Sequence, residues 1–175
     1  TNNSRPKDRL PTTEELKKYA KNMSEVAKVV KGETGIQPSY HNHMNQYGET
    51  PEEVDALVKA MNPAYVRLLL DVAHYHQGGG KPAEAVLKYQ MVLHSLHIKD
   101  VECPIKGDSN PKSYKFVELG QGNVDLLGVF AALDKIKFSG WAIVELDAVP
   151  DKAKLPVQCA QISKDFLQGR IAYQF

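Results

Sequence analysis

Apolar positions along the chain alternate between two periodicities, one typical of helices and one typical of buried strands. Residues 12–31 begin with a Thr that can cap a helix, carry acids in the first turn, and then place apolar side chains at helical spacing. Residues 50–61 repeat this arrangement, with Pro at the first helical position. Residues 65–72 form a nearly continuous apolar run of the kind found in strands covered on both faces.

The alternation continues to the end of the chain and predicts a parallel α/β architecture. We expect further helices and strands over residues 36–43 (strand), 81–93 (helix), 94–101 (strand), 123–137 (helix), 141–147 (strand) and 156–168 (helix). Alternating helices and strands give parallel strands joined by helical crossovers. Residues 102–122 contain Gly, Pro and polar residues throughout, which is typical of an elaborated active-site loop.

Four units of this kind fit either an open four-stranded sheet or half of a (β/α)8 TIM barrel. A TIM barrel needs about 250 residues. The chain has 175 residues and starts in a loop just before a helix. We therefore expect residues 1–175 to supply the C-terminal four strands and helices of a single barrel domain, with the N-terminal half-barrel missing or carried by a complementary chain. An open sheet is the alternative.

Composition limits the partners of this domain. The chain is 42% hydrophobic, which is enough for a core, and its formal net charge of +1 gives no reason to expect nucleic acid or an anionic membrane. No apolar run approaches the ~20 residues that span a bilayer. We expect a cytoplasmic protein; periplasmic or secreted locations stay open, as does homo-oligomerisation. Cys103 and Cys159 are interpreted as free thiols.

Each predicted strand ends in imidazole, carboxylate or ammonium groups. These are His41 and His43, Asp71 and His74, His97 and Lys99, and Glu145 and Asp147. The carboxyl ends of parallel strands gather at one edge of a sheet, and residues two apart on a strand share a face. A single His at a strand end is ordinarily only a hydrogen-bonded residue, but four successive strands with such ends favour one metal site. Imidazoles with carboxylates suit one divalent ion such as Mn²⁺, Co²⁺, Mg²⁺ or Zn²⁺.

Two other histidines fit this pattern poorly. His94 is out of phase with His97, and we expect His76 to lie in a Gly-rich loop. We interpret both as residues without a catalytic part.

Five segments, "YHNHM", "LLLDVAH", "LHIKDVE", "GQGNVD" and "GWAIVELD", resemble the xylose isomerase-like TIM barrels in this order. These are the sugar phosphate isomerase/epimerase family, and the inosose dehydratase branch is the most similar. The resemblance runs from residue 38 to the end and covers strands five to eight of the barrel. It implies one divalent ion held by Asp71, His97 and Glu145, with strand five contributing His41, where many relatives have Glu.

The resemblance also implies roles for other side chains. His74 would contact a substrate hydroxyl, and Lys99 follows the metal-binding His as in the dehydratase branch. We add His43 to the candidate substrate-binding residues because it shares a face with His41. Asp125, in "GQGNVD", is interpreted as a helix-start residue rather than a catalyst.

Such a site predicts proton abstraction beside a carbonyl of a sugar or keto-polyol, through an enediolate, with His41 and Glu145 as candidate acid/base residues. Return of the proton makes the protein an isomerase or epimerase, which we place first. Expulsion of a β-oxygen makes it a dehydratase or lyase, which is the alternative. A non-catalytic sugar-binding protein is a third hypothesis. A phosphodiester-cleaving relative would need several zinc ions and a basic groove, and the charge of +1 favours neither.

Overall fold

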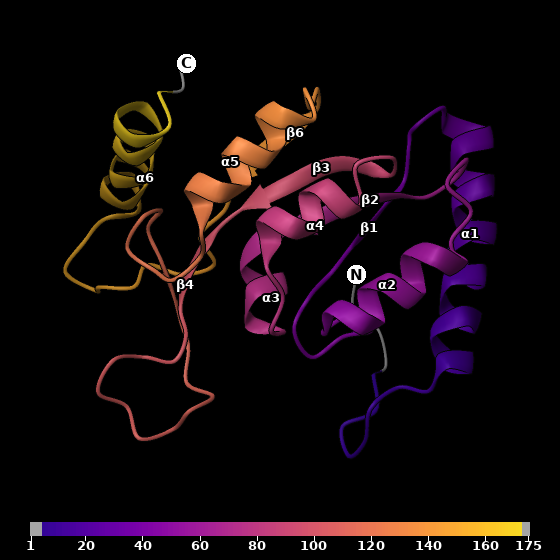
Figure 1. Cartoon of the computed structure of the whole chain (residues 1–175), viewed down its shortest axis with the longest axis horizontal. Helices are drawn as coiled ribbons and strands as arrows, with labels where there is room; N and C mark the ends of the chain where they lie inside the picture. The colour runs from indigo at the N-terminus through magenta and orange to yellow at the C-terminus, as the bar shows by residue number, and fades with distance from the viewer. Residues whose placement is uncertain (1–4, 173–175) are drawn as a thin grey trace.

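The computed structural model describes residues 5–172, in which helices and strands follow one another across the molecule in chain order (Figure 1). The elements are α1 (Thr13–Thr34), β1 (Ser39–His41), α2 (Pro51–Ala60), β2 (Arg67–Asp71), α3 (Val72–Gln77), α4 (Pro82–Lys88), β3 (Leu93–Ile98), β4 (Asp100–Glu102), β5 (Lys115–Val117), α5 (Leu126–Lys135), β6 (Trp141–Val144) and α6 (Pro156–Arg170). Four strands form one parallel sheet in the order β1-β2-β3-β6. The predicted parallel α/β architecture is confirmed.

The first helices begin where their capping residues predict. Thr12 accepts a hydrogen bond from the Glu15 N–H, and the Glu15 carboxylate accepts one from the Thr12 N–H, which is a capping box. Gly35 ends α1 in the left-handed region, with φ of 71°. The Thr50 side chain caps α2 by accepting a hydrogen bond from the Glu53 N–H, and Pro51 is the first residue of this helix.

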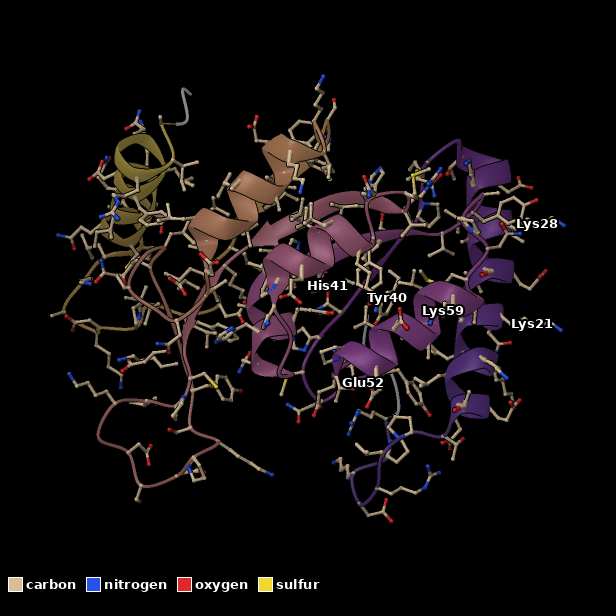
Figure 2. The ribbon with its side chains drawn as sticks, viewed as in Figure 1. Lys21, Lys28, Tyr40, His41, Glu52 and Lys59 are labelled. Carbon is tan, nitrogen blue, oxygen red and sulfur yellow. The ribbon has the colours of Figure 1, made fainter. Side chains whose placement is uncertain are left out.

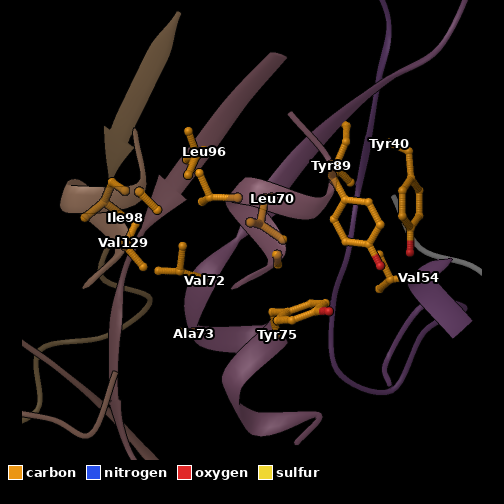
Figure 3. Close-up of a cluster of buried hydrophobic side chains, with 14 of the residues drawn as sticks. Tyr40, Val54, Leu70, Val72, Ala73, Tyr75, Tyr89, Leu96, Ile98 and Val129 are labelled. Carbon is orange, nitrogen blue, oxygen red and sulfur yellow. The ribbon is translucent and has the colours of Figure 1, made fainter. Parts of the chain in front are cut away.

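One face of the sheet packs against the helices and forms the core. Its fully buried strand residues are Tyr40, Leu68, Leu70, Leu96 and Ile98. Figure 3 shows this apolar cluster running from Val129 of α5 to Tyr40. In the register, Tyr40 pairs with Leu68, and Leu70 pairs with Leu96. Since successive residues of a strand point to opposite faces, the residues between these apolar positions lie on the other face.

Four local predictions were wrong in detail. The helix predicted over residues 81–93 ends at Lys88, and the strand predicted over 94–101 stops after Ile98. The residues that follow form β4, which pairs antiparallel with β5, so the predicted loop 102–122 contains a hairpin. His76 lies in α3 and not in a loop, because the Asp71 side chain caps a helix that begins directly after β2.

Both outer strands of the sheet have one free edge in the described residues. β1 pairs only with β2, and β6 pairs only with β3. All four residues of β6 are exposed, and Trp141 is 74% exposed. None of the described helices is long and apolar enough to cross a membrane. Cys103 and Cys159 are free, as expected.

Candidate metal centre

The register of the sheet brings three predicted ligands onto the face opposite the core. Asp71 pairs with His97, and His41 lies one strand further along, paired with Leu69. Figure 2 places His41 near the middle of the molecule, whereas Lys21 and Lys28 point outward from α1.

Asp71 Oδ2 is the centre of this group. His41 Nε2 lies 3.4 Å from it, and His97 Nδ1 lies 3.6 Å from it. The ligand atoms of His41, Asp71 and His97 all lie within 4.8 Å of one another, and they form the one cluster of this kind within residues 5–172. Asp71 is fully buried, while the two imidazoles are partly exposed. The sequence therefore placed these three side chains together correctly.

Backbone hydrogen bonds fix the position of Asp71. Its Oδ1 accepts from the His74 N–H at 2.9 Å, at the start of α3. The Asn42 side chain accepts from the Asp71 N–H at 2.9 Å and donates to the Asp71 carbonyl at 3.1 Å. Burial alone would raise the pKa of Asp71, but the neighbouring His41, His97 and Lys99 side chains outweigh burial and hold that pKa well below its usual range. Asp71 is therefore an anion at neutral pH.

Sequence reasoning missed Asn42. The signal was its place between His41 and His43, since a buried amide at that position faces the opposite way from the two imidazoles and needs backbone partners.

Lys99 lies beside Asp71 with its ammonium surrounded by carboxylates. Its Nζ is 2.7 Å from Asp147, 3.1 Å from Glu145 and 3.6 Å from Asp71. Lys99 is 1% exposed. Burial lowers the pKa of Lys99. Asp71 and the hydrogen bonds to Asp147 and Glu145 raise that pKa by more than burial lowers it, so Lys99 is a cation. One cation among three carboxylates leaves an excess of negative charge that a divalent ion would offset.

Glu145, which directly follows β6, lies next to the cluster of His41, Asp71 and His97 but is not part of it. Its Oε2 lies 2.8 Å from His97 Nδ1, and the set of atoms within 4.8 Å of one another does not include it. His97 Nδ1 is buried and makes no hydrogen bond in the described structure, despite that short distance. Asp71 and Glu145 raise the pKa of His97, because a positive charge at this ring is favourable beside two carboxylates. A divalent ion at the buried nitrogen would take the place of that proton. The residues present therefore fit a divalent ion.

The His43 and His74 rings lie next to His41, with ring centroids 5.7 and 6.2 Å from that of His41. Their ring centroids are 3.7 Å apart, and His43 Nδ1 is 2.7 Å from the Met44 carbonyl. His74 is 2% exposed, and burial lowers its pKa to about 4, so His74 is neutral. Its Nε2 is buried without a hydrogen bond, 3.9 Å from Asp71 Oδ2.

Two residues interpreted as non-catalytic stand apart from the cluster. His94 Nδ1 lies 3.2 Å from Ser39 Oγ. Asp125 caps α5 by accepting a hydrogen bond from the Gly128 N–H at 2.9 Å, as the sequence predicted.

Curated proteins similar to this chain include inosose dehydratases. An inosose dehydratase from Clostridium tetani is 29% identical over 170 residues, which cover 92% of this chain and 56% of that protein. An inosose dehydratase from Glaesserella parasuis is 33% identical over 149 residues, covering 78% of this chain and 49% of that protein. The chain therefore spans about half the length of the curated relatives it matches.

Solved structures show the same fold. A structure of the IolI protein with a bound zinc atom has a TM-score of 0.72 and 26% identity, over 96% of this chain and 60% of that chain. A sugar phosphate isomerase/epimerase from Parabacteroides distasonis has a TM-score of 0.71 and 23% identity, over 92% of this chain and 57% of that chain. Residues 2–164 match the family model described as xylose isomerase-like TIM barrel, and the chain belongs to this family.

Proposed function

We propose that the protein carrying this chain is a metal-dependent enzyme that removes a proton beside a carbonyl of a sugar or keto-polyol and then expels a hydroxyl as water. The convergence of His41, Asp71 and His97 on one point is the observation that carries the proposal. Imidazoles mixed with carboxylates suit a single Zn²⁺, Mn²⁺, Co²⁺ or Mg²⁺ ion. The zinc atom in the IolI structure supports an ion of this class.

Elimination of water is favoured over isomerisation by the sequence relatives, which are inosose dehydratases. The sequence alone had placed isomerisation or epimerisation first. All of these reactions begin with the same proton removal, so the ligands do not choose between them. Structural neighbours below 25% identity show only the fold, so they do not change the preference for elimination of water over isomerisation.

The ligand set that we propose is His41, Asp71, His97 and Glu145. A divalent ion bound there would polarise a substrate carbonyl and stabilise the negative charge that develops when the neighbouring proton leaves. Asp71 is already ionised and held by backbone contacts, so it needs no rearrangement to bind a cation.

Proton transfer requires a group that can reach the substrate. The Glu145 side chain is 37% exposed and lies beside the Lys99 ammonium, so we assign Glu145 as the acid/base residue on this side. Lys99 would donate hydrogen bonds to a substrate oxygen. His43 and His74 would line the rear of the substrate site, and His41 keeps two candidate roles, as ligand and as acid/base.

The test is proton exchange and water loss in deuterated water. Metal-loaded protein is incubated with an inosose, and NMR follows deuterium entry beside the carbonyl together with formation of the unsaturated product. His97→Ala should lose metal and both signals. His94→Ala is the matched control on the same strand and should keep them.

Three other outcomes would change the proposal. Deuterium entry without loss of water would assign isomerisation or epimerisation. Sugar binding without exchange in the metal-loaded protein would support a non-catalytic role. Unchanged metal binding in His97→Ala would show that the site is wrongly placed.

A further inference from the structure

Asp100 is a buried carboxylate whose partners are all backbone amides. It is 1% exposed and directly follows Lys99. Its side chain accepts hydrogen bonds from four N–H groups, those of Val101 (2.9 Å), Gly120 (2.9 Å), Gly122 (2.9 Å) and Val124 (3.1 Å). No ion pair found among residues 5–172 involves Asp100. Burial raises the pKa of Asp100, and the four backbone N–H groups partly offset this by stabilising the charge, in the manner of an anion-binding nest.

The turn around this carboxylate is shaped to receive it. Gly120 has φ of 82°, in the left-handed region that favours glycine. A methyl group on Gly122 would overlap the Asp100 carboxylate, so the backbone can approach this closely only at a glycine. The motif that the sequence analysis interpreted through Asp125 alone thus has a second part, a pair of glycines that surround Asp100.

The Asp100 carboxylate connects the two ends of the hairpin, because Asp100 begins β4 and binds the turn that follows β5. Asp100 is the first residue of β4 and pairs with Val117 of β5, and the next residue, Val101, pairs with Phe116. The turn at residues 120–124 follows β5 and precedes α5. The hydrogen bonds that Asp100 accepts from this turn therefore connect the base of the hairpin to the segment just before α5.

Phe116 of the hairpin lies against two side chains beside the candidate metal ligands, Lys99 and His74. The Phe116 ring lies 4.5 Å from the Lys99 ammonium, and its centroid is 5.4 Å from that of His74. A cation over an aromatic face is held in place and screened from water. The position of Phe116 therefore affects how Lys99 faces the substrate site.

We propose that Asp100 is a positioning residue, whose carboxylate fills the backbone nest and so holds hairpin β4–β5 and Phe116 against Lys99. Its effect on turnover rests on the proposed function, whereas its effect on the hairpin does not. The nest binds a carboxylate, so a free small carboxylate such as formate can replace the side chain when it is removed.

Hydrogen exchange with mass spectrometry tests this on the full chain. In Asp100→Gly, the backbone amides of β4, β5 and residues 120–124 should exchange about tenfold to a hundredfold faster, because four N–H groups in these segments lose a charged acceptor or the pairing that it supports. Added formate should restore the slower exchange, and chloride at the same ionic strength should not. The matched control is Asp125→Ala, which changes the cap of α5 without touching the nest and should leave the hairpin unaffected.

A second variant guards against failure of Asp100→Gly to fold. Gly122→Ala keeps the carboxylate but pushes the turn away from it, so the hairpin amides should again exchange faster while β2 stays protected. Gly32→Ala is its control, because a methyl there meets nothing within 4 Å. Unchanged hairpin exchange in Asp100→Gly or in Gly122→Ala would overturn the proposal, as would faster exchange in a folded Asp100→Gly that formate does not reverse.

Kinetics separate the positioning role from the proposed function. In a folded Asp100→Gly variant, metal content should stay unchanged, while kcat/KM for the inosose falls mainly through KM and recovers with formate. If the wild-type protein does not turn over the inosose, the proposed function fails and the exchange experiment still decides the role of Asp100. Lost metal in a folded Asp100→Gly would overturn the assignment to the hairpin.

Discussion

Asn42 offers a direct test of how the fold positions the metal centre. Its side chain is buried and bridges β1 to the end of β2 through both backbone polar groups of Asp71. Asn42→Ala removes both bonds and leaves a buried N–H and a buried C=O without a partner. Each unpaired group costs about 1–3 kcal/mol, so we expect the free energy of unfolding to fall by about 2–6 kcal/mol.

The same substitution should weaken metal binding without removing a ligand. Groups that orient a metal ligand typically change metal affinity by about 10- to 100-fold. Asn42→Asp keeps the acceptor for the Asp71 N–H but places a second carboxylate oxygen against the Asp71 carbonyl. It should therefore be at least as destabilising as Asn42→Ala at neutral pH.

Urea unfolding and calorimetric titration with Zn²⁺ or Mn²⁺ measure the two effects. Asn22→Ala, an exposed site on α1, is the matched control and should stay within about 0.5 kcal/mol of wild type. If Asn42→Ala unfolds at the wild-type urea concentration and binds metal with wild-type affinity, the bridge from Asn42 to Asp71 does not position the site.

Three further predictions follow from burial and charge. Leu70→Ala, at a fully buried position, should lower the free energy of unfolding by about 2–5 kcal/mol in urea denaturation, and a loss below that range would show that the core relaxes around it. Burial raises the pKa of Tyr89 to about 12. Between the unfolded value of about 10 and that value the folded state binds more protons than the unfolded state, so stability should fall with rising pH by up to about 3 kcal/mol. Tyr89→Phe should flatten this fall, and an unchanged slope would contradict it. If His41 is a ligand, His41→Ala should lose metal and His41→Glu should retain it; if His41 is only the base, both variants keep metal and turnover falls by ~10²-fold or more.

The sequence predicted the cluster because parallel strands deliver their carboxyl ends to one edge. His41, Asp71 and His97 are far apart in the chain, yet each lies within a segment predicted to be a strand, and the sheet aligns those segments. Spacing of two residues also placed His97 and Lys99 on one face, and both side chains lie 3.6 Å from Asp71 Oδ2. These inferences needed only strand parity and strand order.

Contacts between residues far apart in the chain could not be predicted from the local sequence pattern. The β4–β5 hairpin pairs Asp100 with Val117, Asp100 also accepts hydrogen bonds from a turn about twenty residues later, and no local periodicity marks the short strands. α3 follows β2 without a loop because the Asp71 carboxylate, expected only as a metal ligand, also caps the helix. Asp71 is thus both a helix cap and a candidate metal ligand, and the spacing of polar residues at the strand ends predicted only the second role.

The exposure of β6 bears on the hypothesis of a half-barrel. The Asp71 and Lys99 side chains are almost fully buried, while those of Glu145 and Asp147, after β6, are 37% and 35% exposed. The metal centre is therefore enclosed on the side of β2 and β3 and open toward β6, the strand whose outer edge has no partner in the described residues. An unpaired parallel edge with an exposed Trp141 suits pairing with a further strand. We therefore expect additional strands, on the same polypeptide or on a complementary chain, to cover β6. A strand there would reduce the exposure of Glu145 and restrict the substrate to one approach.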